Sequence, residues 1–138
     1  STWIFTFNTI WIFFNFIMFK KIMDKKIFDL ASDVSNYGLK NKYKNFASVK
    51  NRKCGDKIKV ELNIKNKIIK KMYYETESCI FCQASASVIS KYVKDLMVKN
   101  LDKIETHKNF TTLINKKYIA RKECVLLPYE ALKKAINN

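Results

Sequence analysis

Arginine, glycine, proline and histidine are scarce in this sequence. Only two of its 27 basic residues are arginine, and it holds two glycines, one proline and one histidine. Lysine, asparagine and isoleucine are abundant instead, as codons rich in A and T would supply. A net charge of +15 would by itself suggest a nucleic-acid or anionic-membrane partner. Because the lysines form no recognisable nucleic-acid motif, we expect no nucleic-acid partner and attribute the charge to composition.

A convincing secretory signal is also missing. The uncharged stretch 1–19 is rich in Trp, Phe and Ile, but it has neither a basic start nor a small-residue cleavage site. It is nearly long enough to cross a bilayer, so a membrane anchor stays an alternative. We favour translation of AT-rich upstream DNA, with Met18 or Met23 nearer the natural start. We therefore set residues 1–22 apart from a domain at 23–138, and expect a cytoplasmic protein with reduced thiols and no membrane attachment.

The hydrophobic pattern predicts an α+β domain, a small antiparallel sheet backed by helices. Apolar residues make up 48% of the chain, which excludes disorder. Strict alternation over 57–65 predicts a half-buried strand with Lys59, Glu61 and Asn63 facing outward. A turn at Asn66-Lys67 leads to a second strand over 68–76, and 47–49 is a candidate third strand.

Helical spacing predicts several helices around this hairpin. The first spans 24–34, with Asp24 as N-cap and Gly38 beyond its end. A long helix is expected over 78–98. A loop or short helix follows at 100–108, and another helix begins at 110–115. Pro128 at a first-turn position opens the last helix, which runs to Ala135.

Three of the four cysteines fall beside the ends of these elements. Cys54 precedes the first strand of the hairpin, Cys79 precedes the long helix, and Cys124 precedes the Pro128 helix. Helix N-termini stabilise thiolates, and Asp56 adds a hard oxygen donor. Three thiolates and one carboxylate suit zinc or an iron–sulfur cluster. Because the sequence does not contain two CxxC motifs, the alternative of buried, inert cysteines stays open.

Three motifs resemble the NifU/IscU/SufU family of iron–sulfur cluster scaffolds. The run 51–58 (NRKCGDKI) is similar to the family's Asn-Pro-x-Cys-Gly-Asp-x-Ile, and 79–87 (CIFCQASAS) to its cysteine with Ala-Ser-Ala-Ser. The run 121–132 (RKECVLLPYEAL) is similar to its Arg-x-x-Cys before a Leu-Pro helix. The motifs occur in the family's order, and the likeness covers about residues 24–136.

The resemblance implies an α+β sandwich that gathers iron and sulfide and then transfers the cluster. It gives the ligand roles to Cys54, Asp56, Cys79 and Cys124, with Cys124 as the expected acceptor of persulfide sulfur. The implied cargo is a transient [2Fe–2S] cluster, and the implied partners are a cysteine desulfurase and acceptor apo-proteins. Such a scaffold is not an enzyme. A zinc-bound sulfurtransferase of the SufU type is the alternative, and a structural zinc module is a third.

Several residues depart from the family pattern or stay open. The family's proline before the first cysteine is absent, and Arg52-Lys53 stand there instead. One branch of the family has a histidine just before the third cysteine, where this sequence has Glu123, which is an alternative ligand. Cys82 forms a CxxC with Cys79, which would suit redox chemistry, but a spare thiol is the favoured interpretation. The single histidine, His107, is expected at the surface. Arg121 could attract sulfide or form a surface ion pair.

Overall fold

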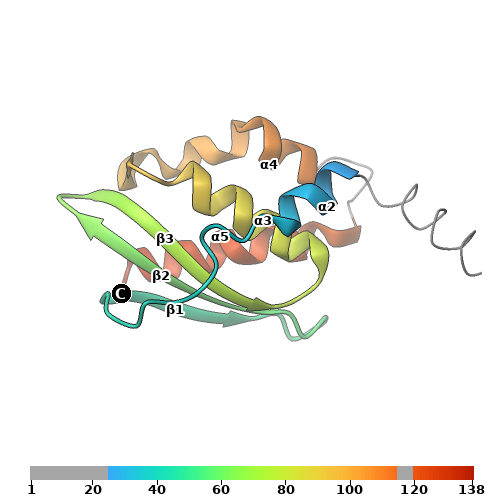
Figure 1. Ribbon diagram of the computed structural model, residues 1–138, viewed down its shortest axis with the longest axis horizontal. Coiled ribbons are helices and arrows are strands. Elements are labelled where there is room, and N and C mark those ends of the chain that lie inside the picture. Colours follow the sequence, from blue (N-terminus) through green and yellow to red (C-terminus); the bar gives the residue numbers. More distant parts are fainter. Residues whose placement is uncertain (1–24, 115–119) are drawn as a thin grey trace, which may run out of the picture.

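The computed structural model describes residues 25–114 and 120–138, and it confirms the α+β architecture (Figure 1). Its antiparallel sheet has the order β1-β2-β3-β4. The strands are β1 (Asn45–Lys50), β2 (Lys57–Lys65), β3 (Ile68–Glu77) and β4 (Leu96–Met97). The helices are α2 (Lys25–Ser32), α3 (Ile80–Tyr92), the 3₁₀ helix η1 (Val98–Thr106), α4 (Lys108–Leu113) and α5 (Lys122–Ile136). In this part of the chain, no helix is long and apolar enough to cross a membrane. The apolar stretch 1–22, for which an anchor was the alternative interpretation, lies outside the described residues.

The core lies between the sheet and the helices α3 and α5. Helix α5 packs on β1 and β2, α3 packs on β3, and α2 and α4 both lie against α3. The inward residues of β2, Ile58, Val60 and Leu62, are fully buried in one cluster with Val125 and Leu132 of α5. The period-two pattern of β2 therefore builds this core as predicted.

The hairpin and the weakly marked edge strand are both confirmed. Asn66 and Lys67 have φ of 53° and 63°, which fits a two-residue turn between twisted strands. The candidate strand at 47–49 is the centre of β1, which pairs with β2. The first helix ends before Val34, while Gly38 has a positive φ of 109°. The predicted N-cap, Asp24, lies outside the described residues.

The long helix predicted over 78–98 is wrong at its C-terminal end. Helix α3 stops at Tyr92, and the chain then turns through Asp95, whose φ is 61°. The Asp95 N–H donates to the Ile69 carbonyl at 2.7 Å, and Leu96 pairs with Ile69 as part of β4. Pairing with the edge of β3 therefore overrides the helical spacing of the apolar residues.

The predicted start of the last helix is wrong as well. Helix α5 begins at Lys122, so Pro128 lies inside it and Cys124 lies in its first turn. Proline's fixed φ is compatible with helix, but its missing N–H removes the bond to the carbonyl four residues earlier, and its ring crowds that carbonyl. That carbonyl belongs to Cys124. The helix thus carries the third cysteine itself instead of following it.

Glu61 was expected on the outer face of β2, yet its exposed fraction is only 1%. The segment 39–44, which leads from α2 to β1 and is called the strap below, crosses that face (Figure 1). The Glu61 carboxylate accepts four strap N–H groups at 2.6–3.0 Å, those of Lys40, Asn41, Lys42 and Tyr43. A buried carboxylate is tolerated here because its oxygens are saturated with donors.

Candidate metal centre

The loop between β1 and β2 places Cys54 and Asp56 on one end of the sheet. Gly55 has a φ of 78°, and its N–H donates to the Asn51 carbonyl at 2.8 Å. The Asn51 N–H in turn donates to the Asp56 carbonyl at 2.8 Å. Glycine suits this turn because it adopts positive φ at no steric cost. The closed loop leaves Cys54 exposed and Asp56 buried.

Cys79 joins this end of the sheet as the N-cap residue of α3. The Asp56 carboxylate accepts the Cys79 backbone N–H through Oδ1 and the thiol through Oδ2, both at 3.3 Å. The carboxylate thereby serves a free N–H at the helix start, where the helix dipole also favours negative charge. Asp56 thus ties the N-terminus of α3 to the β1–β2 loop.

Cys124 reaches the same place from the first turn of α5. The two helices are fixed to each other next to it, because the buried Ser85 hydroxyl of α3 donates to the Val125 carbonyl at 2.5 Å. Cys124 is buried. Burial raises the pKa of its thiol well above the usual range, and the neighbouring Cys79 and Asp56 raise it further.

Together these three elements bring side chains that could hold a metal ion into one cluster. The sulfurs of Cys54 and Cys124 and one carboxylate oxygen of Asp56 all lie within 4.8 Å of one another. Cys79 is linked to the cluster through its bonds to Asp56. Soft thiolates with one hard oxygen can hold zinc or iron in a tetrahedral arrangement. The four sequence-predicted ligands thus lie at one end of the sheet.

The four other side chains whose roles the sequence left open lie outside this cluster. Cys82 is fully buried, and burial raises the pKa of its thiol to about 12, although bonds to Ser78 and Thr76 oppose the shift. Glu123 is exposed and pairs with Lys53 at 3.6 Å. His107 is half-buried at the start of α4 against the Tyr92 ring, and Arg121 lies over the Phe81 ring.

A hollow of about 390 Å³ lies beside the cluster, between the β1–β2 loop and α5. Its lining includes Val49, Leu126 and Leu127, with charged residues of both signs around them. The Lys53–Glu123 pair lies on this surface. No sequence signal marked this hollow, because it depends on how the loop and the helix meet.

Comparison with known proteins gives a consistent result. A sequence model described as the NifU-like N terminal domain matches residues 22–138. The chain is 27% identical to the iron–sulfur cluster assembly scaffold protein IscU of Thermotoga maritima, with 87% of this chain and 96% of that protein covered.

Two crystal structures share the fold. The NifU-like N-terminal protein of Brucella abortus has a TM-score of 0.72 at 21% identity, covering 87% of this chain and 95% of that one. The SufU structure of the SUF system from Fervidobacterium islandicum has a TM-score of 0.69 at 22% identity, covering 83% and 96%.

Proposed function

Because the chain belongs to the family of NifU-like N-terminal domains, we propose that it is a scaffold for iron–sulfur cluster assembly. It gathers iron and sulfide as cargo and passes the cluster to acceptor proteins. Its similarity to the Thermotoga scaffold over 96% of that protein's length supports this function. The single observation that carries it is the cluster of thiols and carboxylate at one end of the sheet.

In this proposal, Cys54, Asp56, Cys79 and Cys124 hold the cargo. The three thiolates bind iron strongly, and the carboxylate of Asp56 is the harder, more exchangeable ligand. Loading displaces the thiol protons. The proposed cargo is a [2Fe–2S] cluster that stays only transiently, and residues 23–138 form the unit that carries it.

Sulfur enters as a persulfide from a cysteine desulfurase. The Cys124 thiolate attacks the outer sulfur of the desulfurase persulfide, the desulfurase thiolate leaves, and the sulfur stays on Cys124 as a persulfide. A thiol reductant then supplies the two electrons that convert this outer sulfur to the sulfide of the cluster. Since Cys124 is buried, the residues that cover its thiol must move to admit this partner. The chain turns over no small-molecule substrate of its own, so we class it as a carrier and not an enzyme.

Its four free thiols suit a reducing compartment such as the cytoplasm.

The test is anaerobic reconstitution of the full chain with ferrous iron, cysteine and a cysteine desulfurase. We expect the absorption and Mössbauer spectra of a labile [2Fe–2S] cluster, which is lost in the Cys54→Ala, Cys79→Ala and Cys124→Ala variants. Cys82→Ala is the matched control, because that thiol lies outside the cluster, and it should still load.

A different result would replace this function with the zinc alternative. That result is stoichiometric, tightly held zinc with no cluster, together with faster sulfur release by the desulfurase. In that outcome the same four residues would hold zinc, and one thiolate would leave the metal to accept sulfur.

A further inference from the structure

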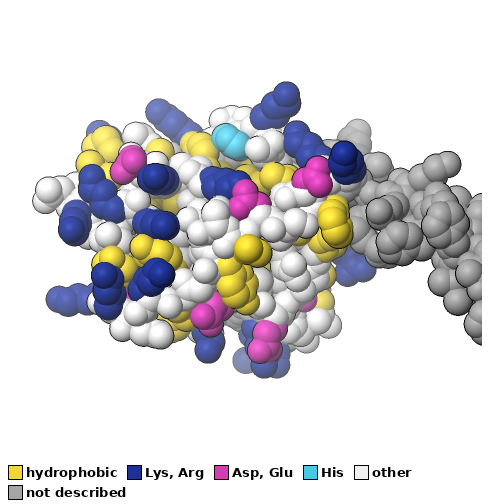
Figure 2. All heavy atoms as spheres, in the orientation of Figure 1, with side chains coloured by type: hydrophobic (Ala, Val, Ile, Leu, Met, Phe, Trp, Pro, Cys, Tyr) yellow, Lys and Arg dark blue, Asp and Glu magenta, His cyan; other side chains and the backbone are white. Residues whose placement is uncertain are grey.

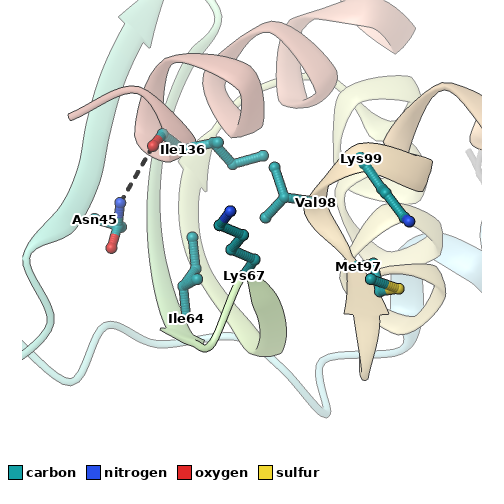
Figure 3. A pocket seen from close by; sticks show the side chains of 7 residues that line it. All are labelled: Asn45, Ile64, Lys67, Met97, Val98, Lys99 and Ile136. Atoms are coloured by element: carbon teal, nitrogen blue, oxygen red, sulfur yellow. Dashed lines mark hydrogen bonds between the residues drawn. The ribbon is translucent and has the colours of Figure 1, made fainter.

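A second concave site lies at the end of the sheet opposite the β1–β2 loop, and Figure 3 shows the residues that line it. This groove has a volume of about 440 Å³, within the roughly 300–1,000 Å³ typical of small-ligand sites. Its lining comes from the start of β1, the end of β2 and the turn after it, β4, the start of η1 and the end of α5: Asn45, Ile64, Lys67, Met97, Val98, Lys99 and Ile136. Along α5, Ile136 lies about 18 Å from Cys124 at the helical rise per residue.

Hydrogen bonds hold the walls of this groove in place. The Val98 N–H donates to the Lys67 carbonyl at 2.9 Å, which fixes the start of η1 against the hairpin turn. The Asn45 side-chain amide donates to the carbonyls of Ala135 at 3.0 Å and Ile136 at 3.4 Å, which fixes the end of α5 to β1 (Figure 3). The groove is therefore formed without a ligand.

The lining is largely apolar and contains two exposed lysines, Lys67 and Lys99. Ile64, Val98 and Ile136 supply aliphatic surface, and Figure 3 shows the Lys67 amino group pointing in among them, while that of Lys99 points away. Neither ion pair of the described residues involves Lys67. Figure 2 shows basic side chains gathered around this hairpin end, with few acidic ones between them. An ammonium group with no carboxylate partner beside aliphatic surface complements an anion with an apolar body.

The backbone at Lys67 gives an independent reason to look at its side chain. Its φ of 63° lies at a turn position that favours glycine, and a lysine there is strained. Strain of this kind at a site often accompanies function.

From these observations we infer that the groove binds a small amphiphilic carboxylate, an aliphatic chain that ends in a carboxylate group. The chain lies on Ile64, Val98 and Ile136, and the carboxylate pairs with the Lys67 ammonium. A small molecule fits better than a helix of a partner protein, because the hairpin turn, η1 and α5 bound the groove on three sides. The site needs no metal, so it is independent of the proposed scaffold function.

The experiment titrates the full chain with octanoate and follows backbone amide signals by two-dimensional NMR. We expect saturable shifts at Ile64, Val98 and Ile136, with weaker binding of octanol and of octyltrimethylammonium. Lys67→Met keeps the aliphatic stem and removes the charge, so it should weaken octanoate binding about tenfold, the loss of one charge-assisted bond. Lys59→Met, an exposed lysine elsewhere on β2, is the matched control and should bind as the parent does.

A second variant separates binding from folding. Lys67→Gly removes the amine but fits the positive φ, so the protein should fold at least as well and still lose the same affinity. The inference is overturned by an absence of saturable shifts at the groove, by equal binding of octanol and octanoate, or by unchanged affinity in both Lys67 variants. Groove shifts with an acidic, leucine-containing peptide but not with octanoate would overturn it in favour of a protein partner.

Discussion

Asp56 has a structural role that is separate from any metal. It is buried, and it accepts both the backbone N–H and the thiol of Cys79 at the start of α3. Asp56→Ala leaves that N–H without its partner and removes a negative charge from the helix N-terminus. We expect a loss of about 1–2 kcal/mol in the free energy of unfolding of the metal-free protein, measured by urea denaturation. Asp29→Ala, on the exposed face of α2, should change it little, and equal effects would contradict this role.

Glu61 should make stability depend on pH. Burial raises the pKa of this carboxyl, but the four strap N–H donors lower it more, so the net shift is below its usual 4.5. A lowered pKa means that the folded state favours the charged form. The stabilisation is thus present above pH 4.5 and lost as the pH falls through the lower folded value.

The variant Glu61→Gln tests this dependence. We expect it to cost about 2 kcal/mol at pH 7, since charge-assisted bonds are the stronger ones, and the difference from the parent should vanish at low pH. Thermal unfolding between pH 2 and pH 7 measures both. Glu77→Gln, at an exposed position of β3, is the control. A pH-independent difference would mean that Glu61 acts through packing alone.

The residue-level predictions succeeded where local pattern decides the outcome. Ile58, Val60 and Leu62 are buried as alternation requires. Glu61 lies on the opposite face of the same strand, and alternation placed it in solvent. The strap that covers it comes from residues about 20 positions earlier, and no local period carries that information. The cysteine ligand set is a prediction that rests on three motifs resembling a known family, since the spacing of scattered cysteines alone is ambiguous.

At the scale of elements, the β2–β3 hairpin has a turn residue that costs stability. Lys67 has a positive φ, which glycine adopts freely and a lysine does not. We expect Lys67→Gly to raise the free energy of unfolding by about 0.5–1 kcal/mol, after the larger entropy of glycine in the unfolded chain is subtracted. Urea denaturation measures it. Lys65→Gly, at the last position of β2, should destabilise, and a loss at both positions would contradict the turn argument.

Element boundaries were harder to predict than element types, and α5 shows why. A proline before an apolar run is typical of a helix start, but Pro128 lies inside α5. The helix begins earlier because Val125 and Leu127 pack in the core and Ser85 bonds to the Val125 carbonyl. Tertiary packing of this kind outweighs the local signal.

At the scale of the whole molecule, like-charge repulsion should limit stability. The net charge is +15, and the described residues contain only two ion pairs, Lys53–Glu123 and Lys91–Asp33. Self-repulsion of a compact chain is relieved on unfolding, and salt screens it over about 10 Å at 0.1 M. We therefore expect the thermal midpoint to rise as sodium chloride increases from about 0.02 to 0.5 M.

A charge-reduced variant distinguishes screening from general salt effects. Lys59, Lys70 and Lys103 are exposed, and neither ion pair of the described residues includes them. Replacing all three with glutamine lowers the net charge without removing a pair, so the midpoint at low salt should rise and the dependence on salt should flatten. Differential scanning calorimetry at matched ionic strengths measures both quantities. If the thermal midpoint of the parent falls with salt, attraction carried by pairs such as Lys53–Glu123 outweighs repulsion. If the midpoint of the variant depends on salt as steeply as that of the parent, the effect comes from the solvent and not from screening.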